Sequence, residues 1–237
     1  MRLLIHVEGE TEESFVNELL RPHLYDFGFT GVSARLLGNA RLRSRRGGIT
    51  SWQTARREIA RHLQSDTGSY AATLVDYYAL PATGPKAWPG REGANDREPD
   101  QRGRYIAEQL NEDIIKQLPQ LDPRRFIPCI LMHEFEGLLF SDCQAFAAGI
   151  DRADLAPNLQ EIRDSFETPE DIDDSPQTAP SKRIQALLRG YQKPLFGVLG
   201  ALEIGLETMR RECPNFRHWL ERLEGLEKKN ELPTATR

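Results

Sequence analysis

Short apolar runs alternate with longer amphipathic segments through the first part of the chain. The apolar runs have the length of buried β-strands, and we expect strands at Leu3–Val7, Val32–Leu37, Ala71–Tyr77 and Phe126–Met132. Between them, apolar residues recur at helical spacing, which predicts helices at Thr11–Phe27, Trp52–Gln64 and Tyr105–Leu118. Strands that alternate with helices are typical of an α/β fold with a parallel sheet.

The pattern changes around and after the last predicted strand. Residues 80–103 are rich in Pro, Gly and charge, which predicts a long irregular loop. Beyond Ser141, an acidic stretch with several prolines precedes helical patterns at Ile184–Leu188, Leu199–Arg211 and Phe216–Leu226. We therefore predict an α/β domain over residues 1–142, flanked by helices, and a helical C-terminal extension over residues 143–237 that packs on it. Residues 227–237 are expected to form a frayed tail.

The ends of the first helix carry local signals. Thr11 is the expected N-cap, and Glu12 and Glu13 suit the positive end of the helix dipole. Gly28 fits just past the C-terminus, where a left-handed residue is common. The first strand therefore passes into this helix through Glu8 and Gly9.

Charge and cysteine content narrow the class of protein. The formal net charge is -5, which argues against a protein that coats nucleic acid but is compatible with an enzyme that has a local basic groove. The cysteines form no CxxC pair, which argues against a disulfide framework or a structural zinc site. We find no signal-peptide pattern and no apolar run near the ~20 residues of a membrane span, so a cytoplasmic protein without membrane contact is expected.

Acidic residues follow three of the predicted strands. Glu8 follows the first, Asp76 lies near the end of the third, and Glu134 and Glu136 follow the fourth, while Glu12 lies one helical turn beyond Glu8. The carboxyl ends of parallel strands meet at one edge of a sheet, and carboxylates crowded there repel unless a cation lies between them. The pattern predicts a site for Mg²⁺ or Mn²⁺. The alternative is that each acid caps a helix or lies in solvent.

Two histidines and two basic segments are further candidates. His6 precedes Glu8 on the same face of its strand and His133 adjoins Glu134, so either could bind a metal or move a proton, although a hydrogen-bonded structural role is the stronger interpretation for His6. A glycine-containing loop is expected to hold nucleic-acid phosphates through Arg41, Arg43, Arg45 and Arg46. Lys182 and Arg183 either reach a phosphate near the acids, or cap a helix or pair with neighbouring acids.

Several motifs resemble known families. The opening Val7-Glu8-Gly9-Glu10-Thr11-Glu12 resembles the start of Toprim domains in nucleases of the overcoming-lysogenization-defect (OLD) type. The wider pattern resembles the bacterial domain of unknown function family 4276, a Toprim-like group, in segments that start at Asp76, His133, Glu167, Asp174, Ala179, Ile204 and Cys213. This resemblance covers nearly the whole chain.

The resemblance implies a Toprim-like fold and metal-dependent cleavage of nucleic acid. Glu8 matches the first-strand glutamate, which serves as an acid/base or a metal ligand. Asp76 matches the first residue of an Asp-x-Asp pair that holds magnesium, but Tyr78 stands in the second position. Either Glu134 or Glu136 supplies the missing ligand, or the site binds metal weakly.

Three functions are therefore open. The first is a nuclease in which Glu8, Glu12, Asp76 and Glu134 hold the metal and carry the chemistry, with Glu136 in support; the resemblance adds a role in anti-phage defence with a separate ABC-type ATPase. The second, favoured by Tyr78, is a catalytically weak Toprim-like binding or regulatory subunit of such a complex. The third is phosphoryl transfer or hydrolysis on a small nucleotide. The substrate, DNA or RNA, and any oligomeric state stay open.

Overall fold

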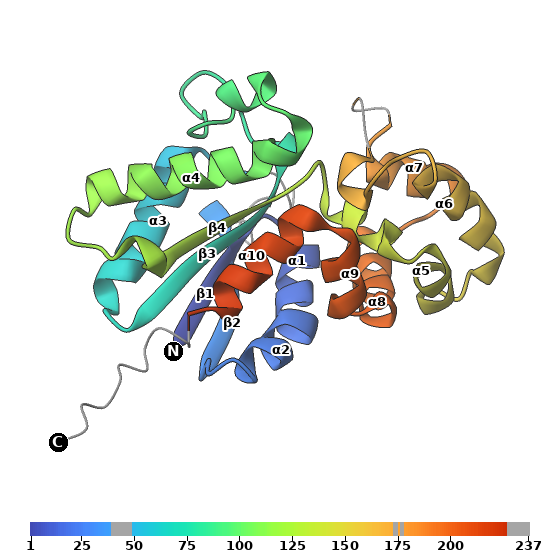
Figure 1. Ribbon diagram of the computed structural model, residues 1–237, viewed down its shortest axis with the longest axis horizontal. Coiled ribbons are helices and arrows are strands. Elements are labelled where there is room, and N and C mark those ends of the chain that lie inside the picture. The colour runs from blue at the N-terminus through green and yellow to red at the C-terminus, as the bar shows by residue number, and fades with distance from the viewer. Residues whose placement is uncertain (39–48, 173–174, 176–177, 227–237) are drawn as a thin grey trace.

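A parallel β-sheet forms the centre of the molecule (Figure 1). The computed structural model describes residues 1–38, 49–172, 175 and 178–226. Within them the sheet has four strands in the order β2-β1-β3-β4, and every neighbouring pair is parallel. The strands are β1 (Arg2–Val7), β2 (Gly31–Leu36), β3 (Ser69–Asp76) and β4 (Phe126–Leu131). This confirms the predicted α/β class, and each strand lies within two residues of its predicted range.

The alternation of side chains along the strands separates two hydrophobic cores. On β1, Leu3, Ile5 and Val7 are buried on one face, where they join Leu74 of β3 and Leu131 of β4. The opposite face of the sheet contributes a second set of apolar residues, Ala71, Val75, Phe126 and Ile130. Because both faces of the sheet are covered, its central strands read as continuous apolar runs in the sequence.

Helices cover each face of the sheet. A continuous helical segment follows β1 and packs on the first face; it comprises α1 (Glu10–Phe15), a π-helical turn (Val16–Leu20) and α2 (Arg21–Tyr25). On the same face α10 (Pro214–Glu224) lies against β4, where the Trp219 indole N–H donates to the carbonyl of Ile127 at 3.0 Å. The second face is covered by α3 (Trp52–Ser65) and α4 (Pro99–Gln117).

The start of the first helix differs from the prediction. Gly9, not Thr11, is the N-cap of α1, and the Glu12 carboxylate accepts the Gly9 N–H at 3.0 Å. Gly28 has a φ of 73°, as expected for a glycine just past a helix end. The helix therefore begins after only two linking residues, Glu8 and Gly9, and Glu12 in its first turn reaches back to Gly9.

Two other helix boundaries also differ. The helix predicted from Tyr105 begins at Pro99, because proline suits the first turn of a helix, so the predicted loop ends five residues earlier than expected. The helix predicted over Leu199–Arg211 is two helices, α8 (Lys193–Ile204) and α9 (Leu206–Glu212). Gly205 lies between them with a φ of 76°, a left-handed backbone that ends the first helix.

The second half of the chain is helical in the part described. Beside the sheet it forms α5 (Cys143–Gly149), α6 (Ala156–Arg163) and α7 (Pro180–Leu187), with α8 close to α1 (Figure 1). Its apolar residues share one core with the first face of the sheet. The domain boundary at residue 142 stays a prediction. Among the described helices, none combines the length and the apolar character needed to cross a membrane.

We expect Gly200→Ala to destabilise the protein by about 1–3 kcal/mol. A Cβ atom at this position in α8 would overlap the ring of Phe146 in α5, which outweighs the ~1 kcal/mol that alanine gains over glycine in a helix. The free energy of unfolding in urea measures the effect. Glu203→Ala, an exposed position on the same helix, should change stability by less than about 0.5 kcal/mol, and equal values for both variants would contradict this packing.

Candidate functional site

The predicted acids meet at the carboxyl edge of the sheet. Glu8 directly follows β1, Asp76 ends β3, and Glu134 and Glu136 follow β4, so three adjacent strands deliver them to one place. The charges of Glu12 and Glu8 raise the pKa of Asp76, and the charge of Glu136 raises the pKa of Glu12. The five carboxyl groups therefore form one electrostatic unit, which we call the carboxylate cluster.

Backbone amides hold three of these carboxylates in place. The Phe135 N–H donates to Oδ1 of Asp76 at 3.0 Å, which ties the segment after β4 to the end of β3. The Ser181 N–H, in the first turn of α7, donates to Oε2 of Glu134 at 3.0 Å. Together with the Gly9 N–H on Glu12, these bonds fix the carboxylates by main-chain groups.

A lysine that the sequence analysis did not select lies among the acids. The ammonium Nζ of Lys193, at the start of α8, is 3.1 Å from Oε2 of Glu136 and 3.7 Å from Oε1 of Glu134. Glu136 is 1% exposed, and the Tyr191 hydroxyl donates to its other oxygen at 3.4 Å. Lys193 and Tyr191 are therefore the counter-charge and the second hydrogen-bond donor of the buried Glu136.

Burial and mutual repulsion raise the pKa values of Glu8, Glu12 and Asp76. The pKa of Glu8 rises to about 7, first through burial and then through the charge of Glu12. Burial also raises the pKa of Glu12 to about 7, with the charge of Glu136 adding to the shift. The pKa of Asp76 is well above its usual value for the same reasons, and Lys193 opposes each of these shifts. The cluster is therefore short of positive charge.

The cluster offers oxygen donors to a metal ion. Oε2 of Glu8 is buried and has no hydrogen-bond partner in the described structure, so one carboxylate oxygen is available for a ligand. In the part of the chain that the structure describes, no three His, Cys, Asp or Glu side chains are arranged to hold a metal together. Magnesium commonly uses one or two protein carboxylates, with waters and substrate phosphates completing its shell. The donors fit a metal bound in that way.

The histidines next to the acids differ from each other. His6 is fully buried beside His62, with ring centroids 6.2 Å apart, and neither of its ring nitrogens has a hydrogen-bond partner among the described residues. The hydrogen-bonded role expected for His6 is therefore wrong. Burial lowers its pKa to about 3, so its ring is neutral. His133 is buried after β4, with a left-handed φ of 64° that is uncommon outside glycine.

Of the basic residues predicted to hold phosphates, Lys182 and Arg183 lie within the described residues. Arg41, Arg43, Arg45 and Arg46 lie outside the described residues. Arg183 donates through Nε to the Thr178 carbonyl at 2.7 Å, and its guanidinium lies over the Phe166 ring. Lys182 is exposed, with Nζ 3.4 Å from the side chain of Gln185. The local role that the sequence left open for Arg183 is therefore the one its contacts favour.

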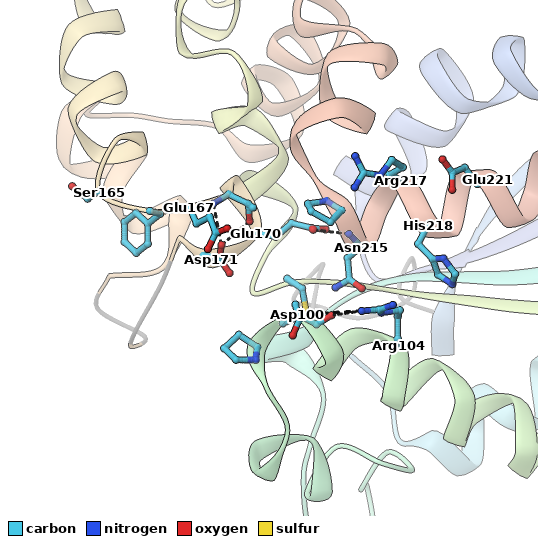
Figure 2. Close-up of a pocket in the computed structure, with 15 residues that line it drawn as sticks. Asp100, Arg104, Ser165, Glu167, Glu170, Asp171, Asn215, Arg217, His218 and Glu221 are labelled. Carbon is cyan, nitrogen blue, oxygen red and sulfur yellow. Dashed lines mark hydrogen bonds and ion pairs between the residues drawn. The ribbon is translucent and has the colours of Figure 1, made fainter.

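A separate cavity of about 820 Å³ opens between the first turns of α4 and α10 and the segment 165–171. Figure 2 shows acidic and basic side chains from these elements around it, including the ion pair of Arg104 with Asp100 at 3.7 Å. The Glu170 carboxylate accepts the N–H groups of Asn215 and Phe216 at 2.7 and 3.0 Å, so it caps α10. The lining has mixed charge and does not point to one class of ligand.

Comparisons with known proteins place the chain in a family. A sequence comparison with curated proteins gives no match. Among solved structures, the chain is similar to the C-terminal region of the OLD protein of Xanthomonas campestris pv. campestris, over 96% of each chain, at 14% identity and a TM-score of 0.42. This similarity is too low to transfer a function. The model of a family described as a domain of unknown function, DUF4276, matches residues 7–224, and the chain therefore belongs to that family.

Proposed function

We propose that this protein is a Mg²⁺- or Mn²⁺-dependent nuclease with a Toprim-like core that hydrolyses phosphodiester bonds at the carboxylate cluster. The observation that carries the proposal is the buried, unpartnered Oε2 of Glu8 within a cluster that is short of positive charge. The resemblance of residues 7–12 to the opening of Toprim nucleases supports the same chemistry.

Electrostatics supports a cation at this place. Glu8 and Glu12 have pKa values of about 7, so each holds a proton for part of the time at neutral pH. A divalent cation would displace those protons and relieve the repulsion that Lys193 offsets only in part. When bound, the ion would supply Lewis-acid stabilisation of the phosphate and activation of water. Glu8, Glu12, Asp76 and Glu134 are the proposed ligands, with Glu136 in support.

The side chains of the cluster suit the remaining steps of hydrolysis. Glu8, whose Oε2 has no hydrogen-bond partner among the described residues, is the proposed acceptor of the proton from the attacking water. The Lys193 ammonium is the proposed donor to the negative charge that develops on the phosphate oxygens. The arginines at positions 41, 43, 45 and 46 are proposed to hold the phosphate backbone of DNA or RNA.

A binding or regulatory role is the second candidate. Tyr78 occupies the position of the second acid of the Asp-x-Asp pair, and the described residues contain no ready three-ligand metal group. In that role the cluster would serve a complex with an ABC-type ATPase, in anti-phage defence, as the resemblance implies. Hydrolysis of a small nucleotide is a third candidate for the same cluster. Activity of the isolated chain separates these functions.

We expect Mn²⁺-dependent cleavage of DNA or RNA that falls about 100-fold or more in Glu8→Gln and Asp76→Asn. Both changes keep the size of the side chain and remove a carboxylate. In the proposal these carboxylates bind the metal, and that of Glu8 also accepts the proton from the attacking water. Gel assays with single-stranded and duplex substrates, run with Mn²⁺, Mg²⁺ and EDTA, measure the effect. Glu161→Gln, an exposed acid of α6, should keep full activity.

An unchanged rate in Glu8→Gln would contradict the nuclease proposal. Absence of cleavage in the wild-type chain, together with Mn²⁺ binding by calorimetry, would favour the binding subunit. Cleavage of mononucleotides alone would favour the third candidate.

We expect the stability of the metal-free protein to fall as pH rises from 5 to 8, on the order of 3 kcal/mol. The pKa of Glu8 is about 7 in the folded chain and 4.5 in its ordinary state, so the folded chain holds a proton that the unfolded chain releases within this range. Urea unfolding in EDTA measures the trend. The free energy of unfolding of Glu8→Gln should fall less between pH 5 and 8, and that of Glu161→Gln should fall as in the wild type. Mn²⁺ should restore the stability of the wild type at pH 8. A wild-type stability that does not change between pH 5 and 8 would contradict the shortage of positive charge in the carboxylate cluster.

We expect Lys193→Met to bind Mn²⁺ about tenfold more tightly while cleaving nucleic acid at least tenfold more slowly. The change removes a positive charge that competes with the metal and, in the same step, the proposed donor to the phosphate. Calorimetry and the gel assay measure the two effects. Lys116→Met, on the exposed surface of α4, is the matched control. Weaker Mn²⁺ binding in Lys193→Met would show that the lysine organises the ligands instead of competing with the ion.

A further inference from the structure

An aromatic pair borders the carboxylate cluster. Tyr78 is 36% exposed, and its ring centroid is 5.1 Å from that of His133, at an angle of 41° between the planes. The Tyr78 N–H donates to the His133 carbonyl at 3.2 Å. The segments that follow β3 and β4 are therefore joined by both a backbone bond and a ring contact.

A third ring supports this pair from the interior. Tyr77 is 3% exposed, and its ring lies 6.0 Å from Tyr78 and 6.1 Å from His133. The guanidinium of Arg91 lies 3.8 Å from the centre of the Tyr77 ring, and the Tyr77 hydroxyl donates to Asn95 at 3.0 Å. Tyr77 and His133 are thus buried parts of the protein, and Tyr78 presents the outer ring.

The ring pair belongs to the two segments that carry Asp76 and Glu134. Asp76 precedes Tyr78 by two residues, and Glu134 directly follows His133. The bond from the Phe135 N–H to Asp76 holds the same two segments together on the side of the acids. A group that stacks on Tyr78 would therefore lie beside the segments that carry the acids of the cluster.

We propose that Tyr78, backed by His133 and Tyr77, is a stacking platform for an unpaired nucleobase next to the phosphodiester that is cut. Every nucleobase has a flat face that stacks on an aromatic ring, whereas the bases inside a duplex already stack on each other. The substrate class is therefore single-stranded nucleic acid, or a strand end or loop with an unstacked base. This inference rests on the proposed nuclease function and specifies its substrate.

Exposure of a tyrosine alone would not support this role, because single aromatic residues on a surface are common. Tyr25 is more exposed, at 48%, but it ends α2. The continuous helical segment that begins with α1 starts at the carboxyl edge of the sheet and returns to the opposite edge, where the Met1 ammonium donates to the Gly28 carbonyl. Tyr25 is therefore a matched control: an exposed tyrosine of the same chain away from the acids.

The test measures binding of a short oligonucleotide that carries 2-aminopurine, whose fluorescence reports stacking. Binding is titrated in Ca²⁺ buffer, with a gel to confirm that the probe stays intact, for DNA and RNA, each single-stranded and duplex. Tyr78→Ala should weaken single-strand binding about tenfold and remove the fluorescence change, with less than a twofold effect on the duplex. Tyr78→Phe keeps the ring and should bind like the wild type, as should Tyr25→Ala.

An abasic probe completes the test. The abasic probe should bind the wild type more weakly than the intact probe, by the same factor as Tyr78→Ala weakens binding of the intact probe. Tyr78→Ala should bind the abasic probe no more weakly than the wild type does. Equal affinity of Tyr78→Ala and wild type for the single strand, or an equal loss for both strand forms, would overturn the platform. Cleavage with Mn²⁺ is scored separately, so absence of cleavage would reject the nuclease proposal and leave the stacking result intact.

Discussion

Crowding of like charges at one edge of the sheet is the constraint on which this structure depends. Parallel strands deliver Glu8, Asp76 and Glu134 to the same place, and the helix after β1 adds Glu12. Burial removes water from Glu8, Glu12 and Asp76, so desolvation and then repulsion raise the pKa values of these three groups. The rest of the chain must supply hydrogen-bond donors and positive charge if the edge is to stay folded.

The helices after β4 supply these hydrogen-bond donors and this positive charge. The Ser181 N–H of α7 reaches Glu134, and Lys193 of α8 reaches both Glu134 and Glu136. The close approach of α8 depends on small residues: a Cβ on Gly197 would lie 3.1 Å from Thr11 of α1. Packing of these helices therefore sets the position of the counter-charge, and the second half works as part of the site.

The sequence predicts a structural feature where its pattern is local, and misses it where the feature depends on residues far apart in the chain. The strands and the acids at their ends were predictable, because apolar runs and strand ends are local features. Lys193 was not, because its contact with Glu136 spans 57 residues and no local pattern marks it. The capping of Gly9 by Glu12 was missed because Thr11 is the stronger N-cap residue by type. His6 was expected to be hydrogen-bonded because of its residue type, but its ring nitrogens have no partner among the described residues.

Tyr78 stands where the resemblance expects the second acid of an Asp-x-Asp pair, and this bears on the nuclease and the binding-subunit candidates. A second aspartate in this position would add negative charge beside Asp76, whose pKa is already raised by Glu12 and Glu8. A tyrosine avoids that cost, and its ring gains the support of His133. In the proposed nuclease, metal binding would then rely more on Glu134 and Glu136, of which Glu136 is already paired with Lys193. A nuclease with this cluster would therefore bind its metal more tightly once a substrate phosphate completes the metal shell.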